Sequence, residues 1–212
     1  MGRLTAVAID TDQMVDWMGR FADEMAEHRQ ELVRLDTAIG DGDHGTNMDR
    51  GMKKAVAKLQ ESPPSDPGAA LKAVAMALIS SVGGAAGPLY GTLFLQMGTA
   101  LGSAPEVDLS AYVGAWRKGL EGVQARGKAQ AGDKTMVDAL IPAVGALEAA
   151  SDLDSGLQAA AEAAEAGMKA TIPLVARKGR ASYLGERSQD HQDPGATSTY
   201  YLFKSAAEAL AG

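Results

Sequence analysis

The sequence has no cysteine among its 212 residues, which excludes disulfide bonds and thiolate chemistry. This absence fits a reducing compartment. No apolar run approaches the roughly 18 residues that a membrane-spanning helix needs. The first residues, MGRLTAVAIDTDQ, contain no long apolar core of the kind found in signal peptides. We therefore expect a cytoplasmic protein that has no membrane partner.

Positive charge is in short supply. The chain has 20 Lys and Arg against 27 Asp and Glu, a net charge of −7, so we expect no nucleic-acid partner. An anionic ligand would need a local source of positive charge, such as a metal, a helix N-terminus or a few arginines. Aromatic residues make up only 5%, but hydrophobic residues reach 46%, which suits a single domain over residues 1–212 with a sizeable core.

What the sequence does have is helical periodicity. Met14, Trp17, Met18, Phe21 and Met25 recur at steps of three and four, which places them on one helix face. No segment alternates like a surface strand. The prediction is an all-α fold of eight helices, with two prolines, at 142 and 173, inside helices. The predicted helices cover residues 10–33, 46–60, 67–81, 88–102, 109–126, 136–150, 154–176 and 196–210.

Four glycine-rich segments lie between these helices. They are IGDGDHGTN (39–47), SVGGAAGP (81–88), RGKAQAGDKT (126–135) and RKGRASYLGERSQDHQDPGATS (177–198). If successive helices run up and down, all four segments fall at the same end of the bundle. We therefore predict that they meet at one rim.

The first segment and the residues just before it carry three carboxylates, on Asp36, Asp41 and Asp43. Three carboxylates within eight residues repel one another unless a cation lies between them. Oxygen ligands suit Mg²⁺, which shares its shell with water and substrate phosphates. The alternative is that Asp36 caps a helix and the other two are solvated turn residues.

These segments partly match three known motifs, a dinucleotide-binding loop, a Walker A motif and an EF-hand, and each of them is rejected. Residues 40–45 satisfy G-x-G-x-x-G, but the preceding residues are helical in pattern and a dinucleotide fold needs a strand there. Residues 127–135 approach a Walker A motif, but Asp133 is one residue too many before Lys134 and Thr135. An EF-hand is excluded because Thr46 and Met52 stand where glycine and glutamate are required.

The remaining segments are suited to phosphate. Glycines 83, 84 and 87 allow close approach to a backbone, and Asp193, Pro194 and Gly195 lead into the last helix. Residues 177–187 hold three arginines and a lysine, and arginine forks suit phosphate. The alternative for this last segment is an exposed, salt-bridged surface.

Together the four segments closely resemble the nucleotide-binding subunit, or L subunit, of bacterial dihydroxyacetone kinases. The resemblance runs the whole length of the chain, with the blocks in family order. One departure is Ala86, where some relatives carry serine, and this removes one hydroxyl contact to phosphate. The resemblance implies eight antiparallel helices closed into a barrel-like bundle, with ADP or ATP bound at the loop rim.

The resemblance also implies roles for individual residues. Asp36, Asp41 and Asp43 would hold two Mg²⁺ ions, and these ions together with Arg180 would neutralise the nucleotide phosphates. The implied catalytic residues are thus these three aspartates and Arg180. The residues expected to line the nucleotide are His44, Gly45, Thr46, Asn47, Ala85, Ala86, Gly127, Met136, Arg180, Asp193, Pro194 and Gly195.

The resemblance implies that this chain is one subunit of an enzyme whose substrate is bound by another subunit. In this family dihydroxyacetone is held by a separate subunit through a histidine. This chain has only His28, His44 and His191, of which His28 is expected on a solvated helix face. In the phosphotransferase-system type, ADP is a fixed cofactor that a separate donor subunit, the M subunit, rephosphorylates. A second copy of this chain is a further candidate partner, in a homodimer.

Two other functions stay open. The chain could be the ATP-exchanging subunit of an ATP-dependent ketose kinase, or a nucleotide-loaded regulatory protein without transfer activity. Three retained aspartates argue against the regulatory alternative. A metal-dependent hydrolase or prenyl synthase is not favoured, because the chain has no D-D-x-x-D motif.

Overall fold

The computed structural model describes residues 8–211, which form nine α-helices, one 3-10 helix and a single bridge between Ile9 and Val107. The predicted all-α fold is confirmed. Among these residues no helix is both long and apolar enough to cross a bilayer. The helices are α1 (Thr11–Glu27), α2 (Arg29–Ile39), α3 (His44–Glu61), α4 (Pro67–Ser81), α5 (Ala86–Leu101), α6 (Leu109–Gly127), α7 (Val137–Ala149), α8 (Leu153–Ala170), η1 (Arg180–Ser188) and α9 (Pro194–Leu210).

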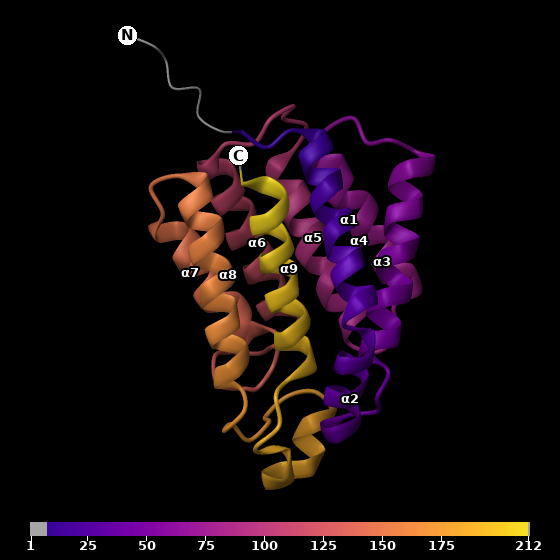
Figure 1. Cartoon of the computed structure of the whole chain (residues 1–212), viewed down its shortest axis with the longest axis vertical. Helices are drawn as coiled ribbons and strands as arrows, with labels where there is room; N and C mark the ends of the chain where they lie inside the picture. The colour runs from indigo at the N-terminus through magenta and orange to yellow at the C-terminus, as the bar shows by residue number, and fades with distance from the viewer. Residues whose placement is uncertain (1–7, 212) are drawn as a thin grey trace.

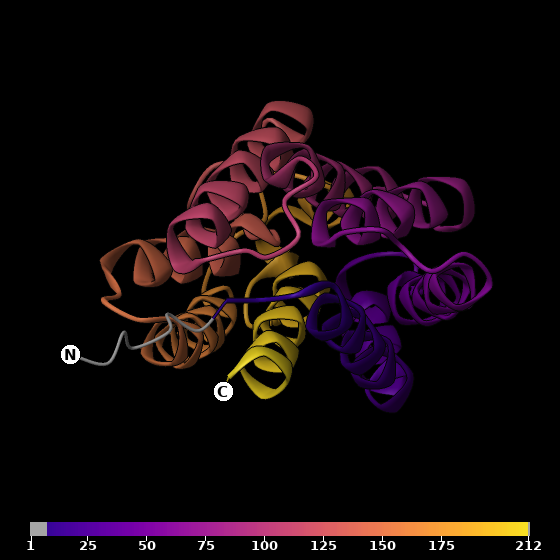
Figure 2. The ribbon, with the colours of Figure 1, turned by 90° about the horizontal axis from the view of Figure 1, so that it is seen from above.

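The long helices follow one another around a closed ring. From α3 to α9 each helix packs against the next, and α1 packs against both α3 and α9. Seen from above, α9 lies between α8 and α1 and closes the ring (Figure 2). The long helices, α1 and α3 to α9, alternate in direction (Figure 1), as predicted for an antiparallel, barrel-like bundle.

The core is made by the helix faces that the periodicity predicts. Met14, Trp17, Met18, Phe21 and Met25 of α1 are all fully buried. The Trp17 ring contacts aromatic rings of α5 and α6, and its Nε1 donates to a backbone carbonyl of α9 at 3.2 Å. Such large side chains contribute much of the apolar area removed from water.

Aspartate caps start the helices at the upper end of the molecule in Figure 1. The carboxylates of Asp10, Asp66, Asp108 and Asp152 accept backbone N–H groups in the first turns of α1, α4, α6 and α8. Each cap of this kind contributes about 1 kcal/mol. Pro67 at the first position of α4 adds a residue pre-set for a helix start.

The first predicted helix, 10–33, differs from the structure. It divides at His28 into α1 and α2, and α2 continues to Ile39. The prediction that His28 lies on a solvated face is wrong. Its ring stacks on Tyr201 with centroids 4.1 Å apart, and Nδ1 lies 3.0 Å from a carboxylate oxygen of Glu31. The His28 ring thus contacts both α9, through Tyr201, and α2, through Glu31.

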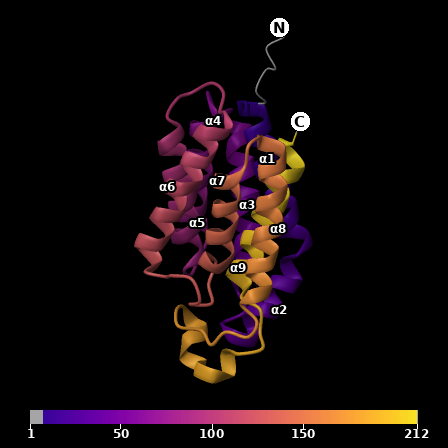
Figure 3. The ribbon, with the colours of Figure 1, turned by 90° about the vertical axis from the view of Figure 1, so that its left-hand side faces the viewer.

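The helix predicted over 154–176 also differs, because α8 ends at Ala170 and Pro173 lies beyond it. Proline disfavours helical backbone at the residue before it, which explains the early end. Pro142 does lie inside α7. Residues 171–193 form a long loop that carries η1 below the helix ends (Figure 3).

Candidate functional site

The lower end of the bundle is where α3, α5, α7 and α9 begin (Figure 1). Within residues 8–211, the N-cap residues Asp43, Ala85 and Met136 of the first three make no side-chain capping bond. Only Asp193, the N-cap of α9, does so. This contrasts with the aspartate-capped helices of the upper end. Backbone N–H groups and the positive ends of helix dipoles thus gather at the lower end, where they favour an anion.

A cavity of about 380 Å³ lies among these helix starts. All four predicted segments contribute to its lining, so the predicted rim is present. The predicted residues that line it are Asp36, Asp41, Asp43, His44, Ala85, Ala86, Gly127, Met136, Arg180, Asp193, Pro194 and Gly195.

Three predicted site residues are not among the described residues that line the cavity, namely Gly45, Thr46 and Asn47. Gly45 is buried where α3 crosses α2, and a side chain there would overlap the backbone carbonyl of Arg29. Thr46 is exposed. The buried amide oxygen of Asn47 accepts from Arg50 at 2.7 Å. Gly45 and Asn47 therefore serve packing and hydrogen bonding in the first turns of α3, whereas Thr46 faces solvent.

Other lining residues were not predicted for the site. Leu89, Val123 and Val137 form an apolar wall, which suits a flat ring such as a nucleobase. Sequence patterns could not separate them from core residues, because they continue the apolar faces of α5, α6 and α7. Lys134 and Thr135 also line the cavity, and their only signal was the imperfect Walker A motif.

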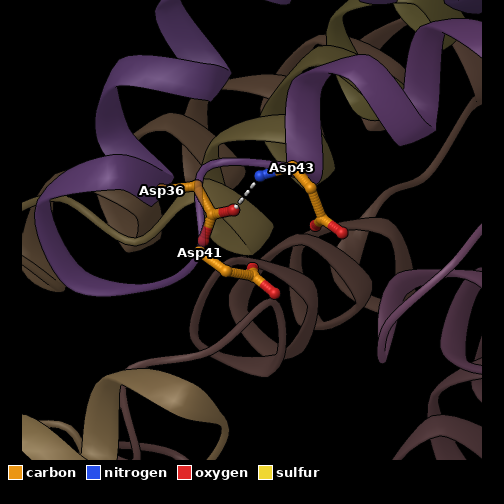
Figure 4. Close-up of side chains that lie close together, drawn as sticks. All are labelled: Asp36, Asp41 and Asp43. Atoms are coloured by element: carbon orange, nitrogen blue, oxygen red, sulfur yellow. Dashed lines mark hydrogen bonds between the residues drawn. The ribbon is translucent and has the colours of Figure 1, made fainter.

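The three carboxylates come together at the edge of the cavity (Figure 4). One oxygen from each of Asp36, Asp41 and Asp43 lies within 4.8 Å of the others. Asp36 is in the last turn of α2 and not in the loop, and its Oδ2 accepts the backbone N–H groups of Asp43 at 2.8 Å and His44 at 3.0 Å. Asp36 thus caps the start of α3 and also faces the cluster. The donor set fits Mg²⁺, which prefers carboxylate oxygens with open positions for phosphate and water.

The long loop reaches the carboxylate cluster through one ion pair. Arg180 Nε lies 2.8 Å from Asp41 Oδ2, and both side chains are partly exposed. Lys178 also lines the cavity. An exposed ion pair contributes little stability, so Arg180 can exchange this partner for a phosphate at low cost.

Residues 38–208 match the family model described as DAK2 domain. The chain belongs to the DAK2 domain family. The resemblance to dihydroxyacetone kinase nucleotide-binding subunits is thereby confirmed.

Relatives of this DAK2 domain include two free subunits. It is 44% identical to the PEP-dependent dihydroxyacetone kinase ADP-binding subunit DhaL of Escherichia coli, over 96% of this chain and 99% of that protein. It is 44% identical to the PTS-dependent DhaL of Lactococcus lactis, over 94% of this chain and 98% of that protein. The crystal structure of the C. freundii dihydroxyacetone kinase in complex with AMP-PNP and Mg²⁺ has a TM-score of 0.71 and 26% identity. The match covers 98% of this chain but only 36% of that kinase.

His44 of the DAK2 domain is held as a neutral ring. Its Nε2 lies 2.9 Å from Ser198 Oγ, which in turn lies 2.7 Å from the hydroxyl of Tyr90. Burial lowers the pKa of His44 to about 4, although the carboxylate of Asp36 acts in the opposite direction. At neutral pH the ring therefore supplies hydrogen bonding and no charge.

Asp193 is a second buried carboxyl group at the cavity, besides Asp36. It accepts the backbone N–H of Ala196 at 2.7 Å as the cap of α9. Burial raises the pKa of Asp193 to about 7, and the neighbouring carboxylate of Asp138 acts in the same direction. Its charge is thus costly unless a cation, such as a protein ammonium or a bound metal, lies nearby.

Asp193→Asn is expected to stabilise the ligand-free DAK2 domain at high pH. Because the folded pKa of Asp193 exceeds its unfolded value, wild-type stability falls as pH rises from about 4 to about 7. Asparagine keeps the cap but cannot ionise. We expect the stability of the variant relative to wild type to rise by on the order of 3 kcal/mol between pH 5 and pH 8, measured by urea unfolding.

The matched control is Asp66→Asn, at the exposed cap of α4. Hydrogen bonds from Ser65 and the Ala69 backbone lower the pKa of Asp66, so its linkage has the opposite sign. That variant should gain nothing at pH 8. Acidification also destabilises the folded protein through the buried neutral His44. This effect is common to wild type and variant and cancels between them. Equal pH profiles for wild type and Asp193→Asn would contradict the prediction.

Proposed function

We propose that this protein is the nucleotide-carrying subunit of a dihydroxyacetone kinase. In this proposal it holds ADP with two Mg²⁺ ions, accepts a phosphoryl group from a donor subunit of the phosphotransferase system, and passes it to dihydroxyacetone on a substrate subunit. The observation that carries the proposal is the three-aspartate cluster that shares one cavity with the starts of α5, α7 and α9. The match to an ADP-binding subunit over nearly its full length supports it.

Each part of the cavity then has a role. Asp36, Asp41 and Asp43 are the metal ligands, and Asp36 is oriented by its two backbone hydrogen bonds. Bound Mg²⁺ supplies neutralisation of the phosphate oxygens, the main requirement of phosphoryl transfer. The N–H groups at the start of α5, around Ala85, face the phosphates. The apolar wall holds the base, and Arg180 adds a second positive group at the cavity mouth.

Two phosphoryl donors remain to be distinguished. A fixed ADP would be recharged by a phosphoprotein, whereas an exchangeable nucleotide would be replaced by free ATP. The 44% identity to two subunits named PEP-dependent or PTS-dependent supports the first. The cavity lined from four separate loops also favours slow release of nucleotide, since several helix ends must move together.

The test begins with the protein as purified. We expect about one ADP per chain, released when a chelator removes Mg²⁺, together with a lower melting temperature, because binding to the folded state alone stabilises it. The protein is then combined with a substrate subunit and a phosphoprotein donor, and dihydroxyacetone phosphate is measured. Turnover should require both partners.

The control omits the donor protein and supplies free ATP. Many turnovers under that condition would contradict the fixed-cofactor proposal and support an ATP-exchanging kinase. Tight Mg-ADP binding with no transfer under any condition would support a regulatory protein instead.

A further inference from the structure

Lys134 is a buried lysine that the proposed chemistry does not use. It lies in the loop between α6 and α7, with φ 62°, and is only 1% exposed. Lysines are almost never fully buried unless they are paired. Lys134 also lines the cavity. Its location in the imperfect Walker A motif suggests a phosphate ligand, but its hydrogen bonds indicate another role.

All the hydrogen bonds described for its ammonium go to backbone carbonyls. Nζ donates to Thr171 at 2.7 Å, to Ile172 at 3.3 Å and to His191. An ammonium has three N–H donors, so these three bonds use all of them. Lys134 therefore has no donor left for a phosphate.

These carbonyls lie at the two ends of the long loop, residues 171–193. Thr171 and Ile172 follow α8, and His191 lies just before the start of α9. Two backbone bonds reinforce the same junction, from Asp190 N to the Ile172 carbonyl at 2.9 Å and from Asp193 N to Thr171 Oγ1 at 3.0 Å. We call the place where residues 171–172 and 190–193 meet the loop base. The ammonium thus closes the base of the loop that carries Arg180.

The backbone around Lys134 is itself fixed. Asp138, in the first turn of α7, accepts the N–H of Thr135 at 2.7 Å and that of Gly132 at 2.5 Å. The Asp133 carbonyl accepts from Arg177 N at 3.0 Å, which adds a second connection to the long loop. Lys134 is therefore held on a constrained turn, from which its side chain reaches the loop base.

The surrounding charges favour this arrangement. Burial lowers the pKa of Lys134, while the carboxylates of Asp193, Asp190 and Asp138 act in the opposite direction. The ammonium is in turn one of the groups that offset the burial of the Asp193 carboxylate. The lysine and the buried cap of α9 thus depend on each other.

We propose that Lys134 is a positioning residue, whose ammonium joins the two ends of the long loop and thereby places Arg180 and Asp193 at the cavity. The proposal rests on the proposed function only in taking Mg-ADP as the ligand of the cavity. The structural part, that Lys134 closes the loop base, stands independently of any ligand.

The central experiment compares Lys134→Met with Lys128→Met. Both variants remove one lysine from the same loop, and Lys128 is exposed and also has positive φ. In ligand-free protein, we expect the amides of Asp190 and Asp193 to exchange hydrogen at least about tenfold faster in Lys134→Met only. Mg-ADP affinity, measured by calorimetry, should fall by at least about tenfold in the same variant, with unchanged helical circular dichroism.

A positioning role also predicts coupling to Arg180. If Lys134 acts by placing Arg180, the loss of phosphoryl transfer in Lys134→Met combined with Arg180→Lys should be clearly smaller than the product of the two single losses. A purely structural lysine would give independent losses that multiply. Multiplying losses would therefore contradict the positioning role.

Thr171→Val tests the same junction if Lys134→Met does not fold. It removes the Oγ1 acceptor of Asp193 N but keeps the shape of the buried side chain, and Thr171→Ser restores that acceptor. We expect faster exchange at Asp193 and weaker Mg-ADP binding in the valine variant only. Wild-type exchange rates and affinity in Lys134→Met would overturn the proposal, and the same result in Thr171→Val would show that closure of the loop base does not place the site. Absence of Mg-ADP binding in wild type would instead contradict the proposed function, while the exchange data would still test the loop closure.

Discussion

Asp43→Asn is expected to abolish tight Mg-nucleotide binding and to lower phosphoryl transfer by roughly 10²–10⁴-fold, because metal-mediated charge stabilisation is worth several kcal/mol. Asp43 is the most direct choice of the three aspartates. Asp36 also caps α3, and Asp41 also pairs with Arg180, so their substitution changes more than the metal site. Affinity is measured by calorimetry and transfer in the reconstituted assay.

The same substitution should have the opposite effect on the metal-free protein. Three carboxylate oxygens within 4.8 Å repel one another, so removing one charge should leave the melting temperature unchanged or raise it. The matched control is Asp12→Asn, which removes an exposed charge from the first turn of α1, at the opposite end of the bundle. Unchanged nucleotide affinity in Asp43→Asn, with a normal fold, would exclude the metal role.

Arg180→Lys is expected to reduce transfer by roughly 10²–10³-fold while the protein stays folded. An arginine facing a transferring phosphoryl group can be worth 10³–10⁵ in rate, and an ammonium cannot form the planar fork that arginine presents to phosphate. The folded state should be little affected, since the Arg180–Asp41 ion pair is partly exposed. Rates are measured in the reconstituted assay.

Arg187→Lys is the matched control for this substitution. Arg187 lies on the same 3-10 helix, is exposed, and is not among the described residues that line the cavity. It should retain transfer. Near-normal transfer by Arg180→Lys would mean that Arg180 serves only the surface ion pair with Asp41.

The fold was predictable because its main determinant is local. The spacing of Met14, Trp17, Phe21 and Met25 specifies one buried helix face, and Asp66 with Pro67 specifies a helix start. The break at His28 was not predictable. The His28 ring stacks on Tyr201, a residue far away in the sequence, and such a contact leaves no local pattern.

The candidate site likewise has features that local sequence predicts and features that depend on contacts distant in the sequence. Glycine-rich loops and crowded carboxylates stand out in a sequence, so Asp41 and Asp43 were recognisable. Gly45 has the same local signal, but the crossing of α2 and α3 assigns it to packing. The role proposed for Lys134 depends on carbonyls that any residue could provide, so no sequence pattern marks it.

The capping pattern also divides stability unevenly along the bundle. Four helices are secured by an aspartate N-cap at one end, while within residues 8–211 three of the four that begin at the other end have no capping bond from their own N-cap side chain. Asp36 caps α3 instead, and Thr135 Oγ1 accepts the first N–H of α7, but no such bond is described for α5. Without ligand, the first turn of α5 therefore frays most easily, and a bound phosphate would act as its cap. Filling the cavity would thus complete the secondary structure, and the empty protein would be loosest where it meets its ligand.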